Sequence, residues 1–134
     1  AAQTAAMKQV AGKLRLDMAS FRELAAFAQF GSDLDEATRH QLDRGLRVQE
    51  VLKQGQYAPV PLVDQVLVFY AVTNGFMDDV ELRKVQDLAA ALVRSMHDSH
   101  PELIQVIASG AKLSEDTQAA LDQAIGDIKS TVAY

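Results

Sequence analysis

Two histidines, His97 and His100, come nearest to a metal site by their type and spacing. They lie three positions apart at the end of a predicted helix, so both imidazoles could face one ion. No third ligand stands at a convincing spacing, and His40 is isolated far upstream. We therefore predict no metal site and keep a small metal enzyme as the least favoured hypothesis.

Two carboxylates, Asp33 and Asp35, could suggest paired catalytic acids or a calcium loop. The third oxygen ligand and the glycine of a calcium loop are missing after Asp35. Capping explains both residues more simply, because a short carboxylate accepts the free amide hydrogens of a helix's first turn. Asp78 and Asp79 precede another predicted helix, where negative charge is favourable, and are interpreted in the same way.

The other sequence motifs that could support catalysis or ligand binding are incomplete. The seven glycines stand alone, and Gly110-Ala111-Lys112 lacks the Lys-Ser or Lys-Thr pair of a phosphate loop. The absence of Cys removes disulfides and thiolate catalysis. Tyr57, Tyr70 and Phe76 could form a recognition surface, but aromatic residues beside loops are more often core anchors. By themselves, the residues indicate a helical interaction domain without a catalytic site.

Length and composition predict a single domain. The chain has 134 residues, of which 49% are hydrophobic, enough for one substantial core. Its net charge of −5 gives no diffuse attraction for nucleic acid or anionic lipid. No apolar run approaches the roughly 20 residues that cross a bilayer, and the first residues lack the pattern of a signal peptide.

The hydrophobic pattern predicts an all-α fold, a single bundle of about six helices whose first helix, over 1–30, is long. A second helix runs from about 36 to 53, and the loop 54–61 follows because it contains Gly55, Pro59 and Pro61. The apolar run 62–72 is interpreted as a buried helix, since no second β-like run could pair with it. Further helices are expected over 81–99, around 103–107 and after Ser114.

Apolar residues at helical steps predict which side of each long helix is buried. Asp43 and Arg47 are expected to form an ion pair on the exposed side of the second helix. The predicted buried stripes of the first and last helices are Met7, Val10, Leu14, Met18, Phe21, Leu24 and Ala28, and Leu121, Ala124, Ile125 and Ile128.

Two stretches carry a family resemblance. In residues 26–35 an alanine- and aromatic-rich helical run stops at Gly31 and an acidic segment begins, and residues 52–57 read Leu-Lys-Gln-Gly-Gln-Tyr. With residues 6–12 and 70–79, they resemble the carboxyl-terminal domain of the α subunit of F-type ATP synthases, and the resemblance covers essentially all of 1–134. Departures are Ala5, Val72 and the pair Phe76-Met77, all tolerable in a helical scaffold.

The resemblance implies a non-catalytic structural and coupling domain within a proton-translocating enzyme. In that family the α subunit also has an amino-terminal β-barrel and a central nucleotide-binding domain, which would lie upstream of Ala1. No catalytic residue can be carried over, and the isolated domain is expected to need no cofactor, whereas the full-length subunit binds Mg-ATP or ADP. Ala1, where a starting methionine would stand, is taken as a sign of truncation.

Two sets of site residues follow from the resemblance alone. Gln54 and Gln56 match the glutamines beside the adenine of the non-catalytic nucleotide, and an amide offers an adenine edge both a donor and an acceptor. The second set corresponds to the tip that faces the rotating γ shaft: Gly31, Ser32, Asp33, Leu34 and Asp35.

The expected partners are the β subunits and the γ subunit of an α3β3 head, with no nucleic acid and only indirect contact with the membrane. The expected location is the periphery of an energy-transducing membrane, with the cytoplasmic face of a bacterial plasma membrane preferred over a mitochondrial matrix or chloroplast stroma. Self-association through exposed apolar surface is also expected of the isolated fragment. The alternative hypothesis is an autonomous helical adaptor that binds an amphipathic partner helix in a groove.

Overall fold

The computed structural model of the chain describes residues 4–28, 36–57 and 61–131, without the side chains of 27, 28, 36, 37 and 54–57. The described elements are α1 (Ala5–Ala28), α2 (Glu36–Tyr57), α3 (Leu62–Thr73), the 3-10 helix η1 (Leu82–Lys84), α4 (Val85–Ser99), α5 (Pro101–Ala108) and α6 (Glu115–Thr131). These residues include six α-helices and no strand, so the predicted all-α bundle with a long first helix is confirmed.

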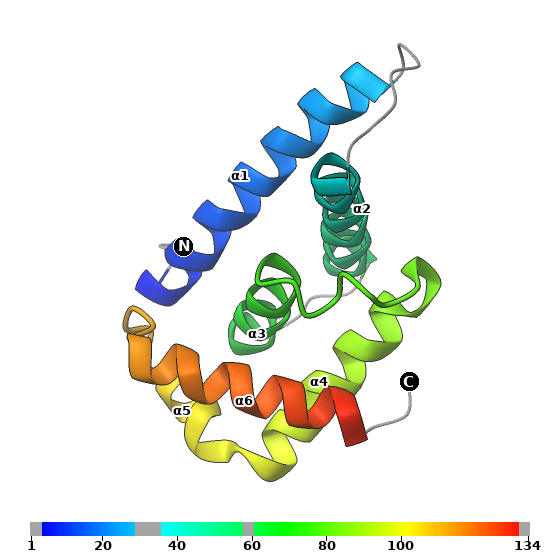
Figure 1. Cartoon of the computed structure of the whole chain (residues 1–134). Helices are drawn as coiled ribbons and strands as arrows, with labels where there is room; N and C mark the ends of the chain where they lie inside the picture. Colours follow the sequence, from blue (N-terminus) through cyan, green and yellow to red (C-terminus); the bar gives the residue numbers. More distant parts are fainter. Residues whose placement is uncertain (1–3, 29–35, 58–60, 132–134) are drawn as a thin grey trace.

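Helix α3 lies at the centre of the bundle (Figure 1) and packs against α1, α2, α4 and α5. This position explains its apolar run over 66–72, because a helix segment covered on several sides has no polar face to present. The ambiguous run 62–72 is therefore a buried helix, as predicted. Its buried residues are Val66, Leu67, Val68, Tyr70, Ala71, Val72 and Thr73.

The helix boundaries follow local signals. Gly75 and Gly110, which follow the ends of α3 and α5, have φ values of 87° and 81°, a conformation that favours glycine. Pro101 occupies the first turn of α5, where its missing amide hydrogen costs nothing. Ser114 Oγ accepts a hydrogen bond of 3.1 Å from the amide nitrogen of Thr117 and caps α6, as predicted.

The predicted end of the second helix near Lys53 is wrong, because α2 continues to Tyr57. A glycine inside a helix costs only about 1 kcal/mol, so Gly55 does not stop it. Pro59 disfavours the helical conformation only at the position directly before it, so it does not prevent a helix up to residue 57. The predicted glycine stop at Gly31 lies outside the described residues, as do the predicted caps Asp33 and Asp35.

The buried stripes agree with the prediction except towards the end of α1. All four predicted residues of α6 are buried, and so are Met7, Val10 and Leu14 of α1. Met18, Phe21 and Leu24 are only partly buried, and the side chain of Ala28 lies outside the described part of the structure. Figure 1 shows the reason: the second half of α1 extends beyond α3 as an arm, with α2 nearby.

Candidate functional site

The predicted rotor-facing tip, Gly31 to Asp35, lies outside the described residues. It connects the end of α1 at Ala28 with the start of α2 at Glu36, and these two helices pack against each other. The structure therefore describes the α1–α2 hairpin that carries the tip and how the hairpin is fixed to the rest of the bundle.

Gln54 and Gln56 lie in the last turn of α2, and not on a loop as predicted. Their backbone is helical, while their side chains are outside the described part of the structure. Their contact with an adenine remains a prediction, and the residues that would make it lie at the end of α2.

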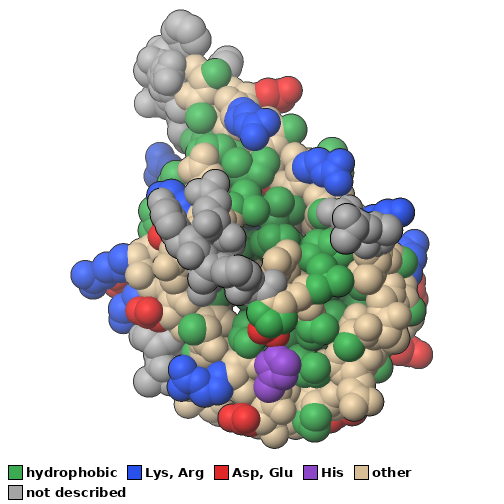
Figure 2. All heavy atoms as spheres, turned by 180° about the vertical axis from the view of Figure 1, so that it is seen from behind, with side chains coloured by type: hydrophobic (Ala, Val, Ile, Leu, Met, Phe, Trp, Pro, Cys, Tyr) green, Lys and Arg blue, Asp and Glu red, His purple; other side chains and the backbone are tan. Residues whose placement is uncertain are grey.

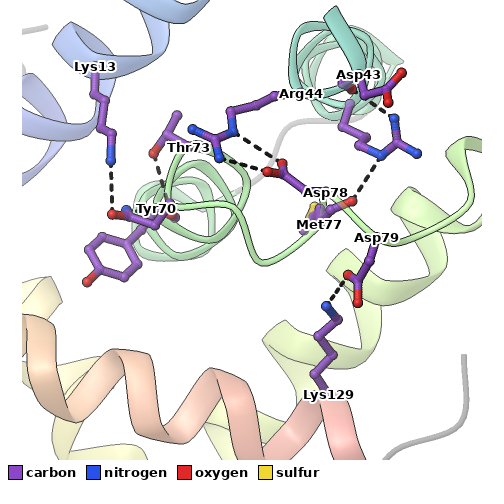
Figure 3. Close-up of polar contacts among 11 residues, drawn as sticks. Lys13, Asp43, Arg44, Tyr70, Thr73, Met77, Asp78, Asp79 and Lys129 are labelled. Atoms are coloured by element: carbon purple, nitrogen blue, oxygen red, sulfur yellow. Dashed lines mark hydrogen bonds and ion pairs between the residues drawn. The ribbon is translucent and has the colours of Figure 1, made fainter. Parts of the chain in front are cut away.

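The hairpin is fixed by residues 74–80, here called the clamp segment, which follow α3 (Figure 3). Two of its side chains, Met77 and Val80, are buried in the core at 0% and 2% exposure. From α1, Lys13 Nζ donates a hydrogen bond of 2.9 Å to Asn74 Oδ1. The clamp segment thus inserts apolar side chains into the core and presents polar groups to the surrounding helices.

Arg44 of α2 and Lys129 of α6 bind the two acidic residues of the clamp segment. The Arg44 guanidinium donates hydrogen bonds of 3.2 and 2.7 Å to the Asp78 carboxylate, and this contact raises the pKa of Arg44. The Lys129 ammonium donates to Asp79 and lowers the pKa of that carboxyl. Asp78 and Asp79 therefore hold α2 and α6 by ion pairs, a role beyond the predicted charge before a helix.

Arg47 of α2 donates hydrogen bonds to main-chain carbonyl oxygens of the clamp segment. Its Nε donates to the carbonyl oxygens of Met77 and Val80, each at 3.0 Å, and Nη2 donates to Val80 at 2.7 Å. Nη1 donates to the main-chain oxygen of Asp43 at 2.8 Å. The predicted ion pair with the Asp43 carboxylate is thus wrong, because unpaired carbonyls in the interior cost more than an exposed ion pair contributes.

A small polar cavity separates α1 and α2 next to Arg44. It has a volume of about 70 Å³ and is lined by Asp17, Ser20, Gln41 and Arg44. Asp17 Oδ2 is buried and, within the described residues, accepts no hydrogen bond. Burial raises the pKa of Asp17, and the positive charge of Arg44 opposes this shift. The cavity is polar and large enough for a water molecule.

Tyr70 fixes α6 to the central helix α3. Its hydroxyl donates to Asp122 Oδ1 at 2.7 Å and lies 3.2 Å from the main-chain oxygen of Gln118. Burial and the neighbouring Asp122 carboxylate raise the pKa of Tyr70. Tyr70 is a core anchor, as predicted, and Phe76 packs against the core in a partly buried position.

The two histidines have separate partners. His97 Nε2 lies 2.7 Å from Asp64 Oδ1 and links the end of α4 to the start of α3, whereas His100 Nδ1 lies 3.6 Å from Glu102 Oε1. Among the residues that the structure describes, no group of three or more His, Cys, Asp or Glu side chains is placed to hold a metal ion. Likewise, no described helix has both the length and the apolar character required to traverse a bilayer.

Comparison with known proteins gives one consistent result. The family described as ATP synthase alpha/beta chain, C terminal domain, matches residues 3–128. ATP synthase subunit alpha of Dehalococcoides mccartyi (strain 195) is 51% identical over 96% of this chain. The same subunit of Sulfurovum sp. (strain NBC37-1) is 50% identical over 99% of the chain, and that of Syntrophomonas wolfei is 48% identical over 98%. The chain spans 26% of the length of each of these relatives.

Proposed function

Because the chain belongs to the ATP synthase alpha/beta chain, C-terminal domain family, we propose that residues 1–134 form the C-terminal domain of the α subunit of a proton-translocating F-type ATP synthase. The observation that carries this proposal is the match over residues 3–128 together with about 50% identity to subunits alpha. The role is structural: the domain couples the state of the nucleotide sites to the angle of the rotor.

The clamp segment supports a rigid-body role. It joins α1, α2 and α6 through Lys13, Arg44, Arg47 and Lys129 while its own Met77 and other apolar side chains are in the core. A packed core resists continuous deformation, so a displacement at the hairpin tip is passed to the whole bundle.

The tip itself would act by electrostatics. Asp33 and Asp35 meet basic residues of the γ subunit through electrostatic interactions that salt screens, and these guide a sliding contact without locking it. The other proposed partners of the domain are the β subunits, with which the α subunits form an α3β3 head.

The domain alone would not hydrolyse ATP. Mg-ATP or ADP binds in the full-length subunit, where Gln54 and Gln56 contact the adenine of the non-catalytic nucleotide. Replacing both glutamines by alanine is expected to lower the occupancy of the non-catalytic site in the assembled head. Unchanged occupancy would contradict this contact.

The proposed location is the periphery of an energy-transducing membrane, at the cytoplasmic face of a bacterial plasma membrane. The relatives named above, all ATP synthase subunits alpha of bacteria, support this choice. Contact with the membrane is indirect, through the complex, and no nucleic acid takes part.

Neutralising the tip tests the coupling role. In the assembled enzyme, replacing Asp33 and Asp35 by asparagine should reduce the number of protons pumped per ATP and weaken cross-linking to γ. A matched control replaces Asp98 and Asp127, which are exposed on α4 and α6, by asparagine. Equal behaviour of the two double variants would refute the proposed role of the tip.

A further inference from the structure

The arm of α1, together with the part of α2 beside it, lies outside the buried core. In α1 the last buried residue is Leu14, and in α2 the first one is Gly45. Residues 15–26 and 38–44, whose side chains are described, are all partly or fully exposed. Figure 2 shows the arm projecting from the broader body of the molecule. The arm therefore depends more on polar contacts with the body than the rest of the bundle does.

The small polar cavity between α1 and α2 lies where the arm meets the body. Asp17 and Ser20 of α1 and Gln41 and Arg44 of α2 line it, so each helix supplies half of its walls. Ser20 and Gln41 are exposed, and solvent can reach the cavity past them. Asp17 Oδ2, in contrast, is buried.

The lining residues have hydrogen-bonding groups that no described residue uses. Asp17 Oδ2 is an acceptor without a donor. Arg44 spends Nε and one N–H of Nη2 on Asp78 (Figure 3), and its other N–H groups have no partner in the described part of the chain. The same holds for the side chains of Ser20 and Gln41. The cavity thus has an acceptor on α1 and donors on α2 that no direct hydrogen bond joins.

The charges around the cavity select a neutral ligand. Besides burial, which raises the pKa of Asp17, the charges of Arg44 and Lys13 lower this pKa and that of Asp78 raises it. With Asp17 itself, two negative and two positive groups therefore act on the site. A bound cation would be repelled by the Arg44 guanidinium, and a bound anion by the Asp17 carboxylate.

Water has the required chemistry and size. It donates hydrogen bonds and also accepts them, so one molecule can serve a carboxylate and a guanidinium together. The cavity of about 70 Å³ accommodates it, because a water molecule takes up about 30 Å³ in the liquid. Buried waters typically occupy such places, between polar groups that are otherwise unsatisfied.

We propose that this cavity is the binding site of a structural water molecule, which donates a hydrogen bond to Asp17 Oδ2 and accepts one from Arg44. Because Arg44 also holds Asp78, the water extends the contacts of the clamp segment through α2 to α1. It fastens the arm to the body at the level where the buried core ends. The site does not depend on the proposed coupling function.

A crystal structure of the full chain at high resolution tests the site. A solvent peak should lie within about 3.2 Å of both Asp17 Oδ2 and a nitrogen of Arg44. Crystals soaked in rubidium or bromide salts should give no anomalous signal at this peak. The absence of a peak, or a rubidium or bromide signal in its place, would overturn the proposal. The peak should persist in Asp17→Asn and disappear in Asp17→Leu, and its persistence in Asp17→Leu would also count against the site.

The same two variants test the site in solution. Asparagine keeps an acceptor for the water, whereas leucine has a similar shape and keeps none. In urea denaturation of the full chain, the unfolding equilibrium constant should be about fivefold larger for Asp17→Leu than for Asp17→Asn, the effect of one lost hydrogen bond. Without the water, leucine would only remove an orphaned polar atom and would give the more stable variant.

Asp127, which is exposed on α6, supplies the matched control. At this position leucine should be at least as stable as asparagine, because leucine is the better helix former. The expected result is thus a reversed order of the two substitutions at positions 17 and 127. The same order at both positions would overturn the proposal, and circular dichroism spectra verify that all four variants fold.

Discussion

Replacement of Arg47 by methionine should remove a large part of the free energy that holds the clamp segment. The guanidinium donates to the carbonyl oxygens of Met77 and Val80 from a partly buried position, at 3.0 Å from Nε to each and 2.7 Å from Nη2 to Val80. Methionine keeps most of the apolar stem of the side chain, so the substitution removes mainly the donors. The Val80 carbonyl then has no partner among the described residues, whereas the Met77 carbonyl keeps the hydrogen bond of 3.1 Å from the Val80 amide nitrogen.

The expected cost is about 3 kcal/mol of unfolding free energy. An unsatisfied carbonyl costs about 1–3 kcal/mol, which applies to Val80, and the lost hydrogen bonds from the charged guanidinium to the Met77 and Asp43 carbonyls add to this cost. Arg47→Lys should lose about half as much, because a single ammonium reaches fewer acceptors than a planar guanidinium.

Urea denaturation of the full chain measures the effect. With a slope near 2 kcal/mol per molar, the midpoint should fall by about 1.5 M for Arg47→Met. Arg94→Met is the control: Arg94 is exposed on α4, and its replacement should change stability by less than about 0.5 kcal/mol. A loss below about 0.5 kcal/mol for Arg47→Met, with an unchanged slope, would refute the role of Arg47 in the clamp.

Four more substitutions test other positions by the same measurement of unfolding free energy. Gly45→Ala should lower the free energy of unfolding by about 1–3 kcal/mol, because the added methyl group would lie 2.2 Å from Phe21 Cδ1. Gly12→Ala should raise it by about 0.5–1 kcal/mol, since the methyl group there meets nothing within 4 Å. Equal effects of the two substitutions would contradict this reasoning. Tyr70→Phe should lose about 1 kcal/mol with the hydrogen bond to the α6 carboxylate, and no loss would contradict its anchoring role. Asp17 has a raised pKa in the folded state, so its proton favours folding in acid and this contribution is lost as the pH rises. Asp17→Asn should therefore stabilise the protein at pH 7, and this gain should shrink as the pH falls towards the ordinary carboxyl value of 3.8, whereas a gain independent of pH would contradict the effect.

The parts of the fold that depend on neighbouring residues could be predicted from the sequence. The positive φ of Gly75 and Gly110, the cap at Ser114 and the buried stripe of α6 all follow from signals within a few positions. Helix α2 shows the limit of such signals, because Gly55 indicated an earlier end than the helix has. A weak helix former does not override the favourable continuation of a helix that is already packed.

The clamp could not be predicted, because its partners are far apart in the chain. Asp78 pairs with Arg44, 34 positions away, and Asp79 with Lys129, 50 positions away. An acidic residue before a helix gives the same local pattern whether it stays in solvent or binds a distant cation. Only the packing of α2 and α6 around α3 selects the partner, and that packing is a property of the whole bundle.

Cross-linking of the hairpin tip to the rotor tests the central claim most directly. The chain contains no Cys, so Asp33→Cys introduces the only thiol of this domain. In the assembled α3β3γ head, the proposed function predicts a disulfide between this residue and a cysteine on γ that forms in some nucleotide states and stops rotation. Asp98→Cys, exposed at the end of α4, should form none. Absence of the cross-link at position 33 in every nucleotide state, or equal cross-linking at both positions, would contradict the account.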